Sequence, residues 1–307
     1  MSILVFGHKN PDTDTICSAI AYAELKGKLG KDVKAVRLGE VNEETKFVLD
    51  YFKVEKPELI ESVSGKEIML VDHNERTQTA DGFEEAKVLE LVDHHRISNF
   101  NVDEPLYVRM EPVGCTATII LKLFKENNLL PEPTTAGLML SAIVSDTLLF
   151  KSPTCTGCDV KAGKELAEIA GVNVEEYGLE MLKAGTALGG KSEAELINMD
   201  MKIFEVDGSK IGVAQVNTVN EAELLERKEK LLAEINNIIN KEGLKFFIFA
   251  ITNILSNDST GIVAGDGNAI IEKAFNEKID NNLIALKGVV SRKKQIIPPL
   301  TKAIQEA

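Results

Sequence analysis

The chain has 307 residues, of which 44% are hydrophobic, and its 48 acidic and 35 basic side chains give a net charge of -13. This length is sufficient for two domains with sizeable cores, and the composition is typical of a globular protein. The negative charge repels nucleic-acid backbones and anionic lipids, so we expect neither nucleic acid nor a membrane as a partner.

The apolar run near the N-terminus is short. Residues Ile3 to Phe6 are too few for a signal peptide, and no apolar segment approaches the length of a membrane span. We therefore expect a cytoplasmic protein with reduced cysteines. Cys155 and Cys158 have the spacing of a redox motif, but they follow a turn instead of a strand, and no second pair completes a zinc site. Structural or incidental roles are favoured for these cysteines.

The first half of the chain alternates predicted strands with predicted helices. Apolar runs predict the strands, and apolar residues at helical spacing predict the helices. This order implies a mainly parallel sheet flanked by helices, in an N-terminal domain of residues 1–186. The strands are expected at 3–6, 33–38, 68–71, 88–92 and 106–110, and the helices at 16–29, 42–51, 115–127, 134–145, 160–170 and 174–184.

Paired glycines mark a boundary between two domains. We place a linker at 187–194 and a smaller, mixed α/β domain at 195–307. Ser192 and Glu195 have the spacing of a capping box, and Asp207-Gly208 predicts the turn of a hairpin. The hairpin strands are expected at 201–206 and 211–216, followed by a helix at 221–241, strands near 246–252, 261–264 and 283–286, and a helix that begins at Pro298.

All four histidines of the chain follow predicted strands, in the company of acids. The carboxyl ends of parallel strands meet at one edge of a sheet, and open α/β sheets bind their ligands there. We therefore expect three segments to converge, in preference to three unrelated solvated loops. The segments are Gly7-His8-Lys9-Asn10-Pro11-Asp12-Thr13-Asp14, Asp72-His73-Asn74-Glu75 and Asp93-His94-His95-Arg96.

The first of these segments supports two interpretations. His8, Asp12 and Asp14 offer nitrogen and oxygen donors to a divalent cation such as manganese, cobalt or magnesium. Alternatively, one of the two aspartates caps the next helix, and His8 is an ordinary loop residue. Asp146 poses a similar choice, because it ends an almost wholly apolar helix, where an unpaired carboxylate would be costly. It either binds a cation or takes part in helix capping.

The candidate ligands exceed what one cation needs. They fit a two-metal site in which one carboxylate bridges the ions and a shared water becomes a hydroxide that attacks phosphorus. Because no redox-cofactor motif or nucleophile triad competes, phosphoryl hydrolysis is the predicted reaction class. The cluster Arg292-Lys293-Lys294 either binds an oxyanion substrate or forms a solvated charged face. The six candidate ligands are His8, Asp12, Asp14, Asp72, His94 and Asp146.

Residues 185–192 match the phosphate-binding loop pattern G-x-x-x-x-G-K-[ST], with Lys191 as its lysine. That motif works by following a strand, whereas these residues follow a predicted helix. A nucleotide site is therefore not favoured here.

The three strand-end motifs, together with Ser291-Arg292-Lys293-Lys294, closely resemble the manganese-dependent family II inorganic pyrophosphatases of the DHH phosphoesterase superfamily. The resemblance covers essentially the whole chain. It implies hydrolysis of pyrophosphate to two phosphates with two Mn²⁺ ions, for which Co²⁺ or Mg²⁺ are alternatives, and with additional Mg²⁺ accompanying the substrate. It also implies a homodimer formed through the N-terminal domain.

The resemblance further implies roles for single residues. One ion would be held by His8, Asp12 and the bridging Asp72, and the second by Asp14, Asp72, His94 and Asp146. The substrate would be bound by His95, Lys202, Arg292 and Lys293, where Lys202 is assigned only from its spacing after the linker. The catalytic group would comprise Asp12, Asp14, Asp72 and His95. The domains would open to admit magnesium pyrophosphate and close to exclude water.

Several other functions stay open on the sequence. Other DHH phosphoesterases cleave oligonucleotides or cyclic dinucleotides, but they typically carry a GGGH motif that this sequence lacks. Exopolyphosphatase activity on short chains is compatible with the motifs. A nucleotidase that uses Lys191 and a non-catalytic metal-binding module are the alternatives from other classes.

Overall fold

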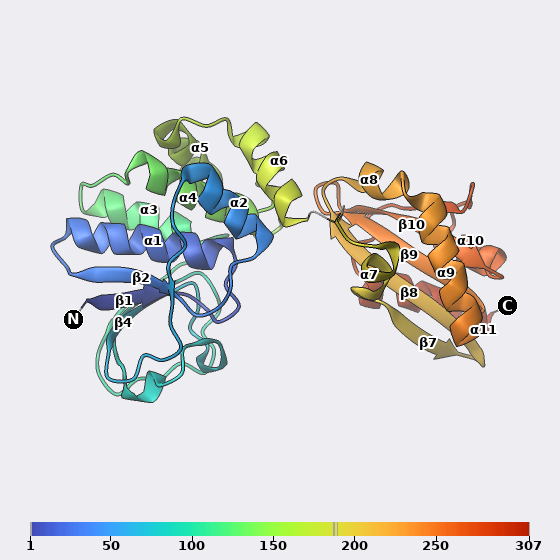
Figure 1. The fold of residues 1–307 in the computed structure, drawn as a ribbon, viewed down its shortest axis with the longest axis horizontal. Helices are drawn as coiled ribbons and strands as arrows, with labels where there is room; N and C mark the ends of the chain where they lie inside the picture. Colours follow the sequence, from blue (N-terminus) through green and yellow to red (C-terminus); the bar gives the residue numbers. More distant parts are fainter. Residues whose placement is uncertain (1, 187, 189, 307) are drawn as a thin grey trace. The chain divides into compact units, whose positions relative to one another are not determined.

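In a computed structural model the chain forms two compact units, Met1–Gly185 and Thr186–Ala307. The structure describes residues 2–186, 188 and 190–306. Each unit has its own sheet (Figure 1). The predicted linker 187–194 includes Ala187 and Gly189, which lie outside the described residues, and its last two residues already belong to a helix, α7 (Glu193–Asn198).

The N-terminal unit is built on a six-stranded sheet in the order β3-β2-β1-β4-β5-β6. Every neighbouring pair is parallel, as the alternation of strands and helices predicted. The predicted strands are confirmed, and the two-residue strand β3 is an addition that the sequence did not indicate. The strands are β1 (Ile3–Phe6), β2 (Val33–Arg37), β3 (Glu58–Leu59), β4 (Glu67–Val71), β5 (Lys87–Asp93) and β6 (Tyr107–Met110).

The helices of this unit begin at polar caps that satisfy their first backbone amides. Asp12 Oδ1 accepts the amide of Thr15 at 2.9 Å, and Asn42 Oδ1 accepts the amide of Thr45 at 2.7 Å. Thr156 caps a third helix, in a capping box with Asp159. The helices are α1 (Thr13–Lys28), α2 (Glu43–Phe52), α3 (Thr116–Glu126), α4 (Pro133–Asp146), α5 (Gly157–Ala170) and α6 (Val174–Gly185).

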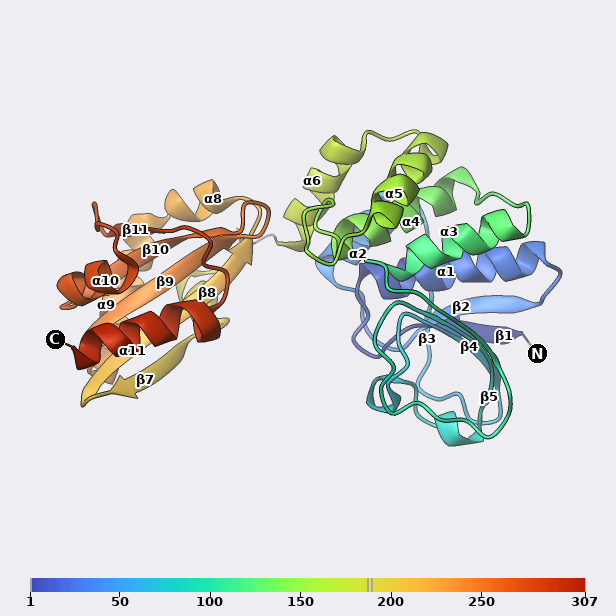
Figure 2. The same ribbon diagram turned by 180° about the vertical axis from the view of Figure 1, so that it is seen from behind.

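The two faces of the N-terminal sheet are covered differently. Helices α1, α3 and α4 lie on one side of the strands (Figures 1 and 2), and α4 packs against both α1 and α5. The other face is covered by the segments that follow β4 and β5, where short 3₁₀ turns place Phe83 against Phe100 and against Phe6 and Leu70 of the sheet. Because β1, β4 and β5 are parallel neighbours, their carboxyl ends lie at one edge of the sheet.

The C-terminal unit has a five-stranded mixed sheet in the order β11-β10-β9-β8-β7. The pair β8–β9 is parallel, and the remaining pairs are antiparallel. The predicted hairpin is confirmed as β7–β8, which turns at Asp207-Gly208. The elements are β7 (Lys202–Val206), β8 (Ser209–Thr218), α8 (Glu221–Leu225), α9 (Lys228–Glu242), β9 (Phe246–Asn253), β10 (Asp258–Gly265), α10 (Asn268–Phe275), β11 (Leu283–Leu286) and α11 (Ile297–Gln305), which follows a π-helical turn at Arg292–Ile296.

Strand β9 is apolar on both faces because helices cover both sides of this sheet. Phe247 and Phe249 belong to a core that includes Leu231 of α9, whereas Phe246 and Ile248 belong to a core that includes Leu300 of α11. Helix α9 lies in front of the sheet in Figure 1, and α11 lies in front of it in Figure 2, which is seen from behind.

The prediction of a single helix at 221–241 is wrong. The structure has two helices there, α8 and α9, which are interrupted at Glu226-Arg227. Arg227 donates from its guanidinium to Glu193 Oε1 at 2.9 Å and to the carbonyl of Lys191 at 2.7 Å. These tertiary contacts coincide with the break.

Among the helices of the described residues, none combines the length and the apolar character that a membrane crossing requires.

Candidate metal centre

The three strand-end segments meet at one edge of the N-terminal sheet. Strands β1, β4 and β5 are adjacent and parallel, so their carboxyl ends place His8, Asp72 and His94 side by side. Gly7 makes the first of these turns, where an added Cβ would lie 2.6 Å from Thr15 Cγ2. A larger residue at this position would displace the Thr15 side chain, whose hydroxyl donates to Asp72.

Asp72 lies at the centre of the cluster, and its side chain is 1% exposed. Its Oδ2 is 3.5 Å from His8 Nε2, and its Oδ1 is 3.4 Å from His94 Nε2. The hydroxyls of Thr15 and Thr116 donate to the same two oxygens, at 2.7 and 3.2 Å. The backbone at Asp72 has a φ of 57°, in the left-handed region that non-glycine residues rarely adopt. Such strain persists where the surroundings fix it, often at functional sites.

The helix-cap interpretation of the opening segment is confirmed at Asp12, and the position of its second oxygen is compatible with the cation interpretation. Its Oδ1 caps α1, while its Oδ2 is 3.4 Å from His8 Nε2. A helix cap and a cation ligand therefore do not exclude each other at this residue.

The orientation of the His94 ring is fixed by a backbone carbonyl on the side away from Asp72. Its Nδ1 lies 3.1 Å from the carbonyl of Val113, so Nδ1–H donates to that oxygen and Nε2 faces the acids of the cluster. That nitrogen is 3.4 Å from Asp72 Oδ1 and 3.7 Å from Asp146 Oδ2. The Nε2 atom of His94 thus lies between two carboxylates.

Asp14 and Asp146 form a second acidic pair beside Asp72. Asp14 is buried and accepts the hydroxyl of Ser18 at 2.5 Å and the amide of Thr116 at 2.8 Å. Donor atoms of Asp14, Asp146 and Cys115 all lie within 4.8 Å of one another. Burial, followed by the charge of Asp14, raises the pKa of the Cys115 thiol well above its ordinary value, so it stays protonated.

The acids of the cluster repel one another. Burial, followed by the charge of Asp14, raises the pKa of Asp72 to about 7, and the same two causes raise that of Asp146 well above its ordinary value. Burial works against protonation of His94, but its hydrogen bond to Asp72 and the charge of Asp14 raise its pKa to about 9. Such shifts cluster at functional sites.

A divalent cation fits this donor set. Within the described residues, no lysine or arginine forms an ion pair with Asp12, Asp14, Asp72 or Asp146. Imidazole nitrogens and carboxylate oxygens suit manganese and related cations. The described donor atoms form three such groups, namely His8-Asp12-Asp72, Asp72-His94-His95 and Asp14-Cys115-Asp146.

His95 and His73 differ from the other histidines. His95 is 51% exposed, and its Nδ1 lies 2.9 Å from Asp93 Oδ1, which leaves Nε2 for another partner. His73 is buried, and its Nδ1 lies 3.0 Å from the carbonyl of Val71. Although His73 lies at the strand end, it belongs to none of the three donor groups.

The basic residues predicted to bind substrate lie in the C-terminal unit. Arg292 is 11% exposed and pairs with Asp200, with 2.8 Å between Nη2 and Oδ1. Asp200 lies two residues before Lys202, so this ion pair joins the start of β7 to the π-helical turn that also contains Lys293. Lys202 and Lys293 are exposed. Within this unit, the predicted cations therefore come from two neighbouring segments.

The phosphate-loop pattern at 185–192 lacks its structural context. Its first glycine ends helix α6 instead of following a strand, and Ser192 and Glu195 form the predicted capping box of α7.

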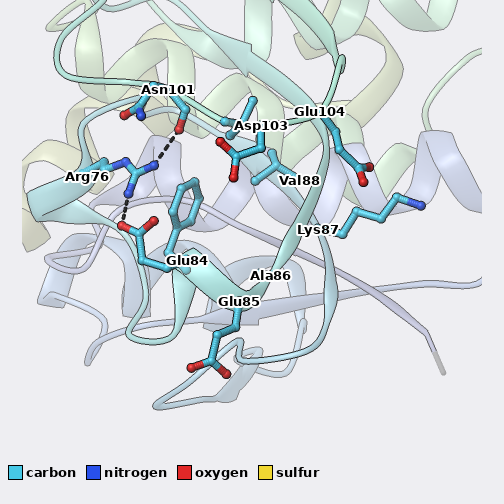
Figure 3. A pocket seen from close by; sticks show the side chains of 11 residues that line it. Arg76, Glu84, Glu85, Ala86, Lys87, Val88, Asn101, Asp103 and Glu104 are labelled. Atoms are coloured by element: carbon cyan, nitrogen blue, oxygen red, sulfur yellow. Dashed lines mark hydrogen bonds and ion pairs between the residues drawn. The ribbon is translucent and has the colours of Figure 1, made fainter.

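A separate hollow of 390 Å³ lies near the start of β5. Figure 3 shows Arg76 joined there to Glu84 and to the backbone of Asn101. None of the predicted site residues lines it.

Several residues that contact the candidate ligands or their neighbours could not be identified from the sequence. Thr15 and Thr116 were not selected, because single threonines are common and their contacts with Asp72 form only in the folded chain. Glu44 was likewise missed, although it accepts the hydroxyl of Thr13 between two candidate ligands. Asp93 was visible within its motif, but its bond to His95 was not.

The fold and this centre define a DHH-type protein. The family model described as "DHH family, N-terminal domain" matches residues 2–143, and the "DHHA2 domain" model matches residues 179–303.

The full-length relatives are more specific. An Exiguobacterium protein named "Probable manganese-dependent inorganic pyrophosphatase" is 60% identical over 98% of both chains, and a Bacillus cereus protein of the same name is 55% identical over 99% of both. A solved Methanococcus jannaschii protein assigned to the family II inorganic pyrophosphatases is 43% identical, with a TM-score of 0.64 over 99% of this chain and 100% of that one. This chain belongs to the manganese-dependent inorganic pyrophosphatase family.

A more distant solved structure shares the fold alone. It is an exopolyphosphatase-related protein from Bacteroides fragilis, 13% identical, with a TM-score of 0.51 over 99% of this chain and 92% of that chain.

Proposed function

We propose that this protein hydrolyses inorganic pyrophosphate to two phosphates at a two-metal site. The observation that carries the proposal is the position of Asp72, whose two oxygens face His8 and His94 at 3.5 and 3.4 Å. A carboxylate that faces two separate nitrogen donors is suited to bridging two cations. The names of the full-length relatives support both manganese and this substrate.

We assign two groups of ligands to the ions. His8, Asp12 and Asp72 would hold one, and Asp14, Asp72, His94 and Asp146 the other. Two Mn²⁺ ions, or Co²⁺ or Mg²⁺ in their place, supply positive charge for the phosphate oxygens and activate a water. The hydroxyls of Thr15 and Thr116 keep both oxygens of Asp72 turned to the two ligand groups.

The substrate is assigned to His95, Lys202, Arg292 and Lys293. Asp93 raises the pKa of His95 through their hydrogen bond, so a protonated His95 can donate Nε2–H to a phosphate oxygen. Arg292 offers a planar fork that matches two phosphate oxygens, and the two lysines add point charges. We infer that pyrophosphate binds with additional Mg²⁺, which lowers its charge before it meets the acidic centre.

Phosphate release from a panel of substrates tests the proposal. Chelator-treated protein is reloaded with Mn²⁺, Co²⁺ or Mg²⁺ and given pyrophosphate, tripolyphosphate or a linear or cyclic dinucleotide. We expect metal-dependent release with pyrophosphate as the preferred substrate. Preference for tripolyphosphate or a dinucleotide would assign the centre to another DHH activity, and metal binding without release from any substrate would indicate a non-catalytic module.

We further propose a homodimer that acts in the cytoplasm. The edge strand β6 leaves Tyr107 and Val108 44% and 46% exposed, and the nearby Ile97 is 74% exposed. An uncovered edge with apolar side chains is suited to pairing with a second copy. Free thiols at the buried Cys17 and Cys115 are consistent with a reducing compartment.

A further inference from the structure

Glu44 is an acid beside the metal centre that is not among the candidate ligands. It lies in the first turn of α2, and its carboxylate points toward α1 and α4. Its Oε1 accepts the hydroxyl of Thr13 at 2.7 Å and that of Ser145 at 2.5 Å. One oxygen atom therefore joins three helices.

Both donors are immediate neighbours of candidate ligands. Thr13 lies between Asp12 and Asp14 at the start of α1, and Ser145 precedes Asp146 at the end of α4. Thr13 Oγ1 is also 3.1 Å from Thr45 Oγ1. Because the single hydroxyl proton of Thr13 goes to Glu44, Thr45 donates to Thr13. This chain of hydrogen bonds fixes the backbone on either side of the ligands.

The backbone of Gly185 packs closely against the Glu44 side chain. A Cβ added to Gly185 would lie 2.8 Å from Glu44 Cβ and 2.7 Å from its Oε2. Helix α6 thus ends against this side chain, and no larger residue fits there unless Glu44 moves.

We propose that Glu44 is a positioning residue of the metal centre, which ties the start of α1 to the end of α4 so that Asp14 and Asp146 face one another. Those two carboxylates repel, and a shared acceptor between their neighbours opposes their separation. The proposal rests on the proposed function, because it assumes that both carboxylates bind a cation.

The direct test is Mn²⁺ titration by calorimetry of the chelator-treated full chain. Loss of contacts that orient metal ligands typically weakens binding about 10- to 100-fold. We expect a loss of that size for Glu44→Ala, whereas Glu44→Gln, whose amide oxygen can accept both hydroxyls, should stay within about threefold of the parent chain. Glu43→Ala is the matched control, because Glu43 precedes Glu44 on the same helix and is exposed.

Two further measurements separate positioning from general stability. Ser145→Ala should weaken Mn²⁺ binding in the parent chain and have little further effect together with Glu44→Ala, since both remove the same contact. The Mn²⁺ paramagnetic resonance spectrum should change from that of a coupled pair toward that of isolated ions in Glu44→Ala. Thermal unfolding of each variant shows whether it is folded.

Glycine substitutions provide an independent route if Glu44→Ala does not fold. Gly185→Ala should weaken Mn²⁺ binding by displacing Glu44, whereas Gly190→Ala should not, because a Cβ added to Gly190 would meet no atom within 4 Å.

The outcomes are distinguishable from failure of the proposed function. A parent chain that binds no Mn²⁺ overturns both proposals. A parent chain that binds two ions and releases phosphate, with unchanged affinity in Glu44→Ala, overturns only the role of Glu44. An equal loss in Glu44→Gln also overturns it, because the charge rather than the shared hydrogen bonds would then be responsible. Additive effects of Glu44→Ala and Ser145→Ala overturn it as well, because the two side chains would then act independently.

Discussion

At the scale of single residues, the chemistry of the centre depends on the hydrogen bonds that orient each histidine ring. The carbonyl of Val113 holds Nδ1 of His94, so its Nε2 faces Asp72, whereas Asp93 holds Nδ1 of His95 and leaves its Nε2 for another partner. The side-chain types in the DHH motif were readable from the sequence. The contacts that select one nitrogen of each ring were not readable, because the carbonyl of Val113 is 19 residues from His94 and the bond between Asp93 and His95 forms only in the folded chain.

Arg292 provides a prediction at this scale. Its guanidinium pairs with Asp200, so it is already oriented when a phosphate competes for it. Arg292→Ala should lower kcat/KM for pyrophosphate about 100-fold or more, and Arg292→Lys about tenfold, because lysine keeps the charge but not the two-pronged contact. Steady-state kinetics measure both effects, and Mn²⁺ affinity should not change.

Lys191→Ala is the control for these variants. It removes an exposed cation from the same unit and also the lysine of the phosphate-loop pattern. Full activity is expected. A large loss in Lys191→Ala, or none in Arg292→Ala, would move the substrate site away from the predicted cations.

At the scale of elements, strand and helix placement was largely predictable, because hydrophobic periodicity and end signals agree. Asn42 caps α2, and Asp207-Gly208 turns the hairpin as expected. The break between α8 and α9 was not predictable: buried Leu224, Leu231 and Ile235 keep helical spacing across it, and Arg227 contacts Glu193 only in the folded chain.

The three strand-end segments should make stability depend on pH when metal is removed. Asp72, with a pKa of about 7, and His94, with a pKa of about 9, hold protons more tightly in the folded than in the unfolded chain. A raised pKa stabilises the fold at low pH, and this contribution is lost as pH rises through the folded value. The buried His73 has a pKa lowered to about 4 and acts in the opposite direction, but only below its ordinary value of 6.5.

We therefore expect chelator-treated protein to lose on the order of 2 kcal/mol of unfolding free energy between about pH 6.5 and pH 9. Denaturant unfolding at a series of pH values measures this slope. Protein saturated with Mn²⁺ should show a much smaller slope, because the cations balance the ionised acids. Equal slopes with and without Mn²⁺ would contradict a cation site at these strand ends.

At the scale of the whole molecule, the two units carry predicted site residues of opposite charge. The N-terminal unit gathers acids and histidines at one sheet edge, and the C-terminal unit carries the predicted cations at Lys202, Arg292 and Lys293. The sequence indicated both sets. Residues 187 and 189, between the two units, lie outside the described part of the structure.

The proposed homodimer gives a prediction at this scale. Val108→Lys places a charge on the exposed edge strand β6 and should yield monomers by sedimentation at micromolar concentration. Leu130→Lys is the matched control, since Leu130 is 60% exposed on a loop of the same unit, and it should leave the dimer intact. A parent chain that sediments as a monomer would refute the proposed dimer.

The most direct test of the metal centre is the number of Mn²⁺ ions bound by the chelator-treated parent chain and by Asp72→Asn, measured by calorimetry together with pyrophosphate hydrolysis. Asp50→Asn, an exposed change in the same unit, is the control. We predict two ions and full activity for the parent and control chains, and for Asp72→Asn at least about 100-fold weaker binding of both ions with little hydrolysis. Two tightly bound ions in Asp72→Asn would contradict a bridging carboxylate at this position.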